Sequence, residues 1–218
     1  IQRFQNNQPF QLPSELENAF RSLLNQTEDS DPALLALALN FPNESYLGEF
    51  LDIIDVLAIH KTRKFLRTEL AQKLQPEFKN TFLNFQNEGT FKIDHQSMGR
   101  RSLKNLCLSY LSELGSLEIR KLALAQFRKN ENMTDVAGAL GVLTHLDCEE
   151  RKVVFKEFEN KWGKNSVVMD KWFALQAISS LPKTLDNVKV LTNHLAYDKN
   201  NPNKIRALIS TFSRFNQL

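Results

Sequence analysis

The sequence predicts an all-α protein, and three observations support this fold class. Apolar residues recur at helical spacing along most of the 218 residues, with a period of about 3.6 residues. Strand-like alternation of apolar and polar residues never persists for more than a few positions. Glycine and proline number only 7 each, so few residues interrupt the pattern. One apolar stripe runs through Leu103, Leu106, Cys107, Tyr110, Leu111 and Leu114.

Cap residues and apolar stripes together place the helices along the chain. An N-cap side chain accepts a hydrogen bond from a backbone N–H that has no partner within the helix, and proline fits the first turn. The predicted helices span residues 14–26, 32–40, 44–52, 56–74, 76–87, 95–114, 117–129, 133–146, 148–162, 166–179, 185–196 and 202–215.

Specific residues justify the predicted helix starts. Ser14 and Glu17 have the spacing of a capping box, and Asp31 and Asn201 each precede a first-turn proline. Pro76 should break or kink the run 56–87, because proline removes a backbone donor and clashes with the preceding turn. Further cap candidates are Asp55, Asp94, Ser116, Asn132, Asp147, Asn165 and Thr184.

The connections between these helices predict the architecture. Most are only about two to six residues long, which places neighbouring helices antiparallel. We therefore expect residues 1–218 to form a single helical domain of stacked antiparallel hairpins, an α-superhelix of the ARM/HEAT-like type. Residues 1–12 are expected to be a linker or an extended lead-in. The stretch 87–94 is the best candidate for a longer turn, and residues 90–93 could form a short extended segment.

Composition and charge exclude several classes of protein. The net charge is only +3, and the densest basic stretch, at residues 61–67, is interpreted as a solvated helix face, so no nucleic-acid partner is expected. No apolar stretch is long enough to cross a membrane. Cys107 and Cys148 are expected to be reduced thiols of a cytoplasmic protein, with Cys107 in the core. A start at Ile1, without an initiator Met or a signal pattern, suggests a chain taken from a longer one.

No catalytic or metal centre is expected within these residues. The sequence has no H-E-x-x-H pair, no G-x-S-x-G elbow and no Gly-rich phosphate loop. His145 and Cys148 could touch one metal, but two ligands do not make a zinc site. Trp162 and Trp172 are interpreted as core anchors. We therefore predict neither catalytic residues nor metal ligands.

One segment remains as a candidate binding site. In residues 201–206, polar and basic side chains gather at the start of a predicted helix, namely Asn203, Lys204 and Arg206. Backbone N–H groups and the positive end of the helix dipole favour an anion at such a place. The alternative is a capped helix with a solvated arginine, and the residues alone leave both readings open.

Five segments carry a resemblance to a known family. They are EFLDIID at 49–55, RSLKNLCLSYL at 101–111, NMTD at 132–135, VMDKWF at 168–173 and NPNKIR at 201–206. In the same order, they resemble segments of the C-terminal helical domain of bacterial aminopeptidase N. The resemblance spans nearly the whole chain. The chain is expected to end before the last helices of that family.

The resemblance implies a function that composition and spacing do not. Proteins of this family are zinc metallo-aminopeptidases of the gluzincin class, which remove N-terminal residues from peptides. Their zinc site and their G-A-M-E-N segment lie in an earlier domain, so this chain is expected to hold no cofactor and to be inactive alone. The helical domain is expected to enclose the active-site chamber and to limit substrate access. Its partners would be the catalytic domain of the same polypeptide and peptide substrates.

The resemblance also implies roles for the candidate binding residues. Arg206 would point toward the substrate, with Asn203 and Lys204 beside it. Lys204 stands where members of the family often have arginine. A different class of function is also compatible with the sequence: a freestanding helical-repeat scaffold that binds another protein.

Overall fold

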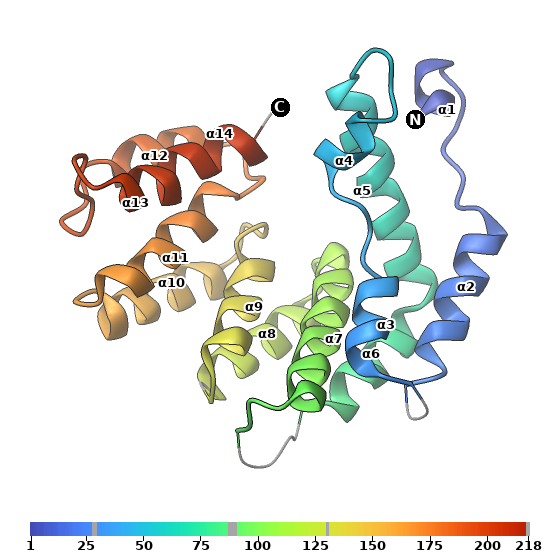
Figure 1. Ribbon diagram of the computed structural model, residues 1–218, viewed down its shortest axis with the longest axis horizontal. Coiled ribbons are helices and arrows are strands. Elements are labelled where there is room, and N and C mark those ends of the chain that lie inside the picture. The colour runs from blue at the N-terminus through green and yellow to red at the C-terminus, as the bar shows by residue number, and fades with distance from the viewer. Residues whose placement is uncertain (28–29, 87–90, 130, 217–218) are drawn as a thin grey trace. The chain divides into compact units, whose positions relative to one another are not determined.

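The computed structural model describes residues 1–27, 30–86, 91–129 and 131–216. Within these ranges the chain forms helices and no strand, which confirms the all-α prediction (Figure 1). The residues group into two compact units, one up to Ile119 and one from Arg120 onward. The boundary falls inside helix α8 (Leu117–Lys129), and the expected single domain over 1–218 stays a prediction.

The first unit holds the elements up to the start of α8. They are α1 (Gln2–Gln5), α2 (Ser14–Leu24), α3 (Pro32–Ala38), α4 (Glu44–Gly48), α5 (Val56–Lys73), α6 (Gln75–Asn84), α7 (His95–Leu111) and the 3-10 turn η1 (Ser112–Leu114).

The second unit holds the remaining elements. They are α9 (Met133–Leu143), α10 (Glu149–Trp162), α11 (Ser166–Ala177), α12 (Thr184–Leu191), α13 (Pro202–Ile205), the π-helical turn η2 (Arg206–Ser210) and α14 (Thr211–Phe215). Every predicted range contains an observed helix, although several helices end earlier than predicted.

Tyr110 of α7 lies at the centre of the first unit. Its side chain is fully buried, and its hydroxyl donates a hydrogen bond to the carbonyl oxygen of Leu39 at 2.8 Å. Its ring stacks on Phe78 of α6 with 4.6 Å between ring centroids and meets the ring of Phe20 of α2 edge-on at 5.8 Å. One tyrosine thus joins three helices and satisfies its own polar group, as a buried tyrosine must.

Arg67 contradicts the expectation that the basic stretch 61–67 is wholly solvated. Only 9% of the residue is exposed, and its Nε donates to Glu113 at 2.7 Å. Its guanidinium also donates to the carbonyl oxygen of Ser109 at 3.1 Å and lies 4.4 Å from the ring centroid of Tyr110. Lys64 is the second cation bound to Glu113. Part of the basic stretch therefore forms a structural ion pair between α5 and Glu113 of η1.

The core of the second unit forms where α10 and α11 pack. Trp172 is 5% exposed, and its indole N–H donates to the carbonyl oxygen of Phe155 at 3.0 Å. Phe173, whose ring lies 5.2 Å from that of Trp172, is fully buried, and so is Leu208. Trp172 is thus the core anchor that was predicted, whereas Trp162, at the end of α10, is only half-buried.

Most of the predicted caps form. Side-chain oxygens accept the expected backbone N–H bonds at Asp31, Asn43, Asp55, Asp94, Ser116, Asn132, Asn165 and Asn201, of which Asn43 was not predicted. The capping box at Ser14 was wrong. Helix α2 begins with Ser14 itself, and the Glu17 carboxylate instead binds Arg21 at 3.1 Å and Lys73 at 2.8 Å.

Two other cap predictions were also wrong. Helix α10 begins after Cys148 with no side-chain cap, so Asp147 does not cap it. Thr184 is the first residue of α12, and its hydroxyl donates back to the carbonyl oxygen of Leu181 at 2.7 Å.

Pro76 breaks the long predicted run, as expected. Helix α5 ends at Lys73 and α6 begins at Gln75, with Leu74 fully buried at the junction. The possible extended segment at 90–93 falls partly outside the described residues, and residues 91–93 form no strand.

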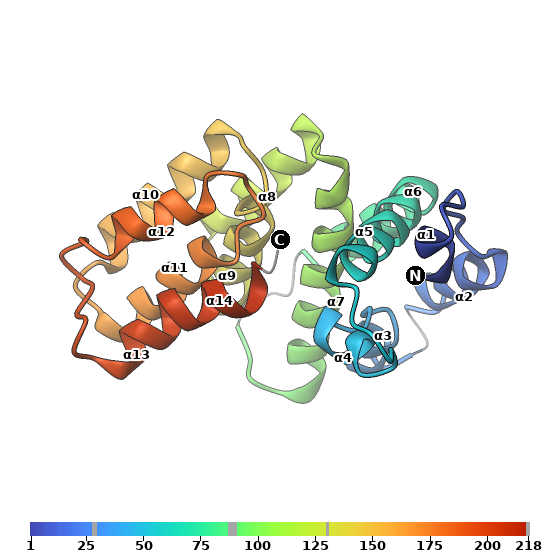
Figure 2. The same cartoon turned by 90° about the horizontal axis from the view of Figure 1, so that it is seen from above.

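The start of the chain is more ordered than an extended lead-in. Residues Gln2–Gln5 form the short helix α1, which lies against α5 (Figure 2). The ring of Phe4 stacks on Phe10 at 5.9 Å, and Phe10 stacks on Phe65 of α5 at 5.0 Å. These rings attach the first residues to the unit. No helix among the described residues combines the length and apolarity needed to span a membrane.

Candidate functional site

The predicted binding residues lie on the short helix α13 and at its end. Asn201 caps α13 by accepting a hydrogen bond from the backbone N–H of Asn203 at 2.9 Å, and Pro202 occupies the first turn. The chain then continues through η2 into α14. Ala207 and Leu208 are buried and fix this segment against α11.

Lys204 points into the protein. Only 3% of the residue is exposed, and its ammonium donates to the Asp170 carboxylate and to the carbonyl oxygen of Ser166, both at 2.6 Å. The ammonium also lies 5.8 Å from the ring centroid of Phe173. Since its donors are directed at α11, Lys204 ties α13 to that helix.

Arg206 lies on the solvent side of the same segment. The residue is exposed, and its guanidinium approaches the amide oxygen of Asn203 at 3.4 Å. The structure therefore brings Asn203 and Arg206 together and directs Lys204 elsewhere. The arrangement can offer an anion a planar guanidinium on an exposed helical turn.

Arg206 also opens the π-helical turn, which the sequence analysis did not predict. Both the backbone N–H of Thr211 and its hydroxyl donate to the carbonyl oxygen of Arg206, the hydroxyl at 3.0 Å. Single π turns inside helices occur often at functional sites. The sequence gives no sign of this turn, because Ile205, Leu208, Ile209 and Phe212 keep the spacing of an ordinary α-helix.

Asp170 and Ser166, the partners of Lys204, were also missed as a structural pair. They lie more than 30 positions before Lys204 in the sequence, at separations of 34 and 38 residues. The only signal was their presence beside and within the VMDKWF segment, which carried the resemblance.

The described residues include no group of three or more His, Cys, Asp or Glu side chains placed to hold a metal ion. The two candidates considered from sequence have other contacts. His145 Nδ1 lies 3.2 Å from the hydroxyl oxygen of Ser180. Cys148 is buried next to Arg120 and Glu150, and burial raises the pKa of its thiol. Neither side chain has a metal-like ligand set around it.

Comparison with known proteins gives consistent relatives. The chain is 36% identical to the Aminopeptidase N of Escherichia coli K12 over 99% of its length, and 32% identical to that of Haemophilus influenzae over the same share. A third relative, the Aminopeptidase N of Caulobacter vibrioides, is 35% identical over 86% of the chain. The resemblance to aminopeptidase N is thus confirmed. The chain spans only 22% to 25% of the length of these relatives.

A solved structure shares the fold. A crystal structure of Legionella pneumophila aminopeptidase A in complex with aspartic acid superposes with a TM-score of 0.85 and 26% identity. The match covers 97% of this chain and 26% of that one. A family model, DUF3458_C, matches the chain over residues 1–218 and is described as a domain of unknown function with ARM repeats. The chain therefore belongs to the DUF3458_C family of helical-repeat domains, which fits a C-terminal part of an aminopeptidase.

Proposed function

We propose that this chain is the non-catalytic helical domain of a zinc-dependent aminopeptidase that removes N-terminal residues from peptides. The observation that carries the proposal is the 36% identity to an Aminopeptidase N over 99% of the chain. The chain corresponds to a quarter of that relative, which leaves ample length for a catalytic domain. The residues described here do not fit a zinc ion, so the metal would belong to the remainder of the polypeptide.

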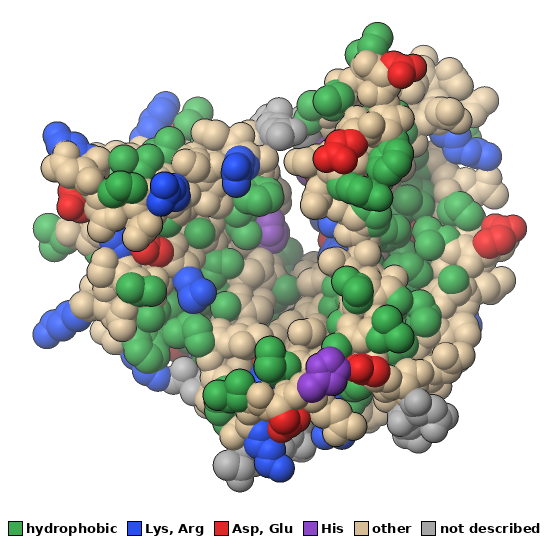
Figure 3. All heavy atoms as spheres, in the orientation of Figure 1, with side chains coloured by type: hydrophobic (Ala, Val, Ile, Leu, Met, Phe, Trp, Pro, Cys, Tyr) green, Lys and Arg blue, Asp and Glu red, His purple; other side chains and the backbone are tan. Residues whose placement is uncertain are grey.

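The partner of this domain would be the catalytic domain of the same polypeptide. The first unit presents a set of large apolar side chains that solvent reaches, and Figure 3 shows apolar groups over α3 and α4. Their exposed fractions are 63% for Leu34, 72% for Leu37, 69% for Phe50, 82% for Ile53 and 62% for Ile54. Exposed apolar side chains that gather in one part of a protein can mark an interface with another domain. With the catalytic domain docked on this surface, the helical domain would enclose the active-site chamber and limit the substrates that enter.

The substrate contact would be made by Arg206, supported by Asn203. A short peptide held by its amine near the zinc must extend its other end away from the catalytic centre. Its carboxylate would meet an exposed guanidinium, which offers two parallel donors. Lys204 would support this contact indirectly, because its ion pair with Asp170 holds α13 in place.

Kinetics of the full-length enzyme test this assignment. A charge-assisted hydrogen bond contributes about 1.5–3 kcal/mol, so Arg206→Ala should raise KM for tri- and tetrapeptides roughly 10- to 150-fold. Single-residue amide substrates are too short to reach Arg206 and should keep their kcat/KM. The matched control is Lys199→Ala, which removes another exposed cation of the same unit and should change neither substrate.

Two results would contradict the role of Arg206. Equal losses on long and short substrates would indicate a folding or docking defect, which Lys204→Ala is expected to produce through its buried ion pair. An unchanged KM on both substrates would make Arg206 a surface residue without a role in substrate binding.

Absence of an H-E-x-x-H segment upstream in the reading frame would instead favour a freestanding helical-repeat scaffold, which the ARM-repeat description also fits.

We further propose a cytoplasmic location. Both cysteines, Cys107 and Cys148, are unpaired thiols inside the protein, as expected in a reducing compartment. Cell fractionation with a tagged full-length protein tests this, and recovery in the periplasm or the medium would contradict it.

A further inference from the structure

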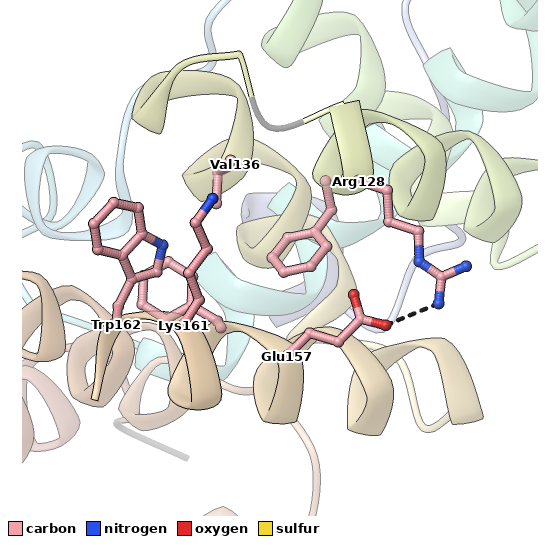
Figure 4. Close-up of a pocket in the computed structure, with 7 residues that line it drawn as sticks. Arg128, Val136, Glu157, Lys161 and Trp162 are labelled. Carbon is pink, nitrogen blue, oxygen red and sulfur yellow. Dashed lines mark hydrogen bonds and ion pairs between the residues drawn. The ribbon is translucent and has the colours of Figure 1, made fainter. Parts of the chain in front are cut away.

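We propose that a pocket between α8, α9 and α10 binds a small carboxylic acid that carries one aromatic ring or one branched aliphatic group. The pocket has a volume of about 130 Å³ and lies wholly within the second unit (Figure 4). It is separate from the Asn203–Arg206 segment, and neither the relatives nor the family description assigns it a ligand.

The walls of the pocket are mainly apolar. They come from Phe127 of α8, Val136 of α9, and Phe158 and Trp162 of α10. Phe158 is 1% exposed and Phe127 is 8% exposed, so the packing of the unit fixes the inner wall. An apolar cavity of about 150 Å³ takes up benzene, so a pocket of this size has room for a single ring.

The charges at the mouth of the pocket favour an anion. Arg128 and Glu157 form an ion pair at 2.9 Å and so largely neutralise one another. Lys161 is exposed, and its ammonium lies 5.1 Å from the ring centroid of Trp162. None of the carboxylates among the described residues pairs with Lys161. One positive charge at the mouth therefore lacks a counterion from the part of the chain that the structure describes.

The placement of these groups limits the size of the ligand. Figure 4 shows Lys161 and Trp162 next to each other at one side of the pocket, with the Arg128–Glu157 pair at the other. A ring between the aromatic walls would place a carboxylate one or two bonds away beside the Lys161 ammonium. The combination of an apolar pocket with a few convergent polar groups is typical of small-molecule sites.

Three matched probes test the proposal on the 218-residue chain. They are 3-phenylpropanoate, its neutral amide 3-phenylpropanamide and its cationic analogue 3-phenylpropylamine. At the affinity per non-hydrogen atom that is typical of drug-sized ligands, the acid should bind with a dissociation constant of about 4 mM. The amide should bind roughly two- to fivefold more weakly, because an exposed ion pair adds little, and the amine should bind more weakly still.

The readout is the indole N–H resonance of Trp162 in ¹⁵N-labelled protein. Trp172 is the internal control, because it is buried and its indole N–H is bonded to Phe155. We expect the probes to shift the Trp162 resonance and to leave the Trp172 resonance in place. The affinity should be highest for the acid, lower for the amide and lowest for the amine. Equal affinity of the three probes would overturn the role of Lys161, and no shift at Trp162 would overturn the site.

Two variants separate the charge from the apolar walls. Lys161→Gln should reduce the affinity for the acid to that of the amide and leave the amide unchanged. Lys164→Gln, an exposed lysine outside the pocket, should leave both unchanged. Trp162→Ala should weaken the acid and the amide alike. If Lys161→Gln and Lys164→Gln reduce acid binding equally, general surface charge explains the binding and the proposal fails.

Discussion

Buried charged side chains join helices within each unit. Arg67 connects α5 to Glu113 in η1, and Lys204 connects α13 to Asp170 in α11. Removing water from a charge is costly, so such residues persist only with a good partner. The sequence predicted neither pair, since the partners lie 46 and 34 positions apart and single charges resemble a solvated face until the fold brings them together.

The pKa of Glu113 predicts how the first unit responds to acid. Burial by itself would raise this pKa, but hydrogen bonds from Lys64 and Arg67 outweigh burial and hold it below the ordinary value of 4.5. A carboxyl with a lowered folded-state pKa stabilises the fold fully above its unfolded pKa and loses that contribution as the pH falls through the folded value. The protein should therefore lose stability as the pH falls below about 4.5, partly through Glu113.

Glu113→Gln tests this pH dependence. The variant should be less stable than the natural protein by about 2 kcal/mol near pH 7, because two cations lose their counterion. The difference should narrow as the pH falls, as urea unfolding at several pH values would measure. The control is Glu131→Gln, which removes a surface partner of Lys129 at 3.8 Å. Its stability should depend on pH in the same way as that of the natural protein. If the difference in unfolding free energy between Glu113→Gln and the natural protein stays constant with pH, Glu113 does not cause the loss of stability in acid.

The helices themselves were largely predictable, because apolar period and cap residues are local signals. Their ends were less so. Helix α4 stops at Gly48 rather than at residue 52, and the predicted helix 202–215 contains a π turn that its pattern does not reveal. The α1 turn depends on a stack of Phe4, Phe10 and Phe65, which is a tertiary contact. Predictions failed where tertiary packing, rather than the residues adjacent in sequence, decides the conformation.

Gly99 and Gly141 form a matched test of helix packing. A Cβ atom on Gly99 of α7 would lie 2.7 Å from the backbone nitrogen of Ala33 in α3, so these helices could not keep their close approach. Gly99→Ala should destabilise the protein by about 1–3 kcal/mol. A Cβ atom on Gly141 of α9 would meet only Leu175 Cδ2 at 3.8 Å, which is an ordinary contact.

Gly141→Ala should therefore stabilise the protein by about 0.5–1 kcal/mol, because alanine favours the helical backbone. Thermal unfolding of both variants, followed by circular dichroism, measures the two signs. If Gly99→Ala proves as stable as Gly141→Ala, the close contact between α3 and α7 is not a constraint.

At the scale of the whole molecule, the described residues form helices and include no group of three or more potential metal ligands. The fold class followed from periodicity, whereas the link to aminopeptidases followed from short segments that resemble a family. The candidate site could be located only in part, because Asn203, Lys204 and Arg206 are adjacent in sequence but face different sides of the chain. Which cation faces solvent depends on how α13 packs on α11, and local sequence does not determine that.

The purified 218-residue chain should not bind zinc stoichiometrically or cleave aminoacyl substrates. The described residues contain no metal-like cluster, and the sequence has no H-E-x-x-H pair to supply two ligands and a general base. Equilibrium dialysis with zinc and assays with aminoacyl amides measure both properties. Tight one-to-one zinc binding, with hydrolysis that a chelator abolishes, would refute this prediction and the division of labour proposed above.

The purified chain should be a monomer at low concentration and should associate weakly as the concentration rises. Its first unit exposes 69% of Phe50 and 82% of Ile53, and burying apolar surface gains about 25 cal/mol per Å². The combined change Phe50→Ser and Ile53→Asp should therefore reduce association measured by sedimentation equilibrium, because it removes apolar area and adds a repelling charge. Val167→Ser alters an equally exposed apolar residue, at 73%, in the second unit and should leave association unchanged. If the two sets of variants associate equally, the apolar surface around α4 is not the contact, and its proposed role in covering the catalytic domain loses its support.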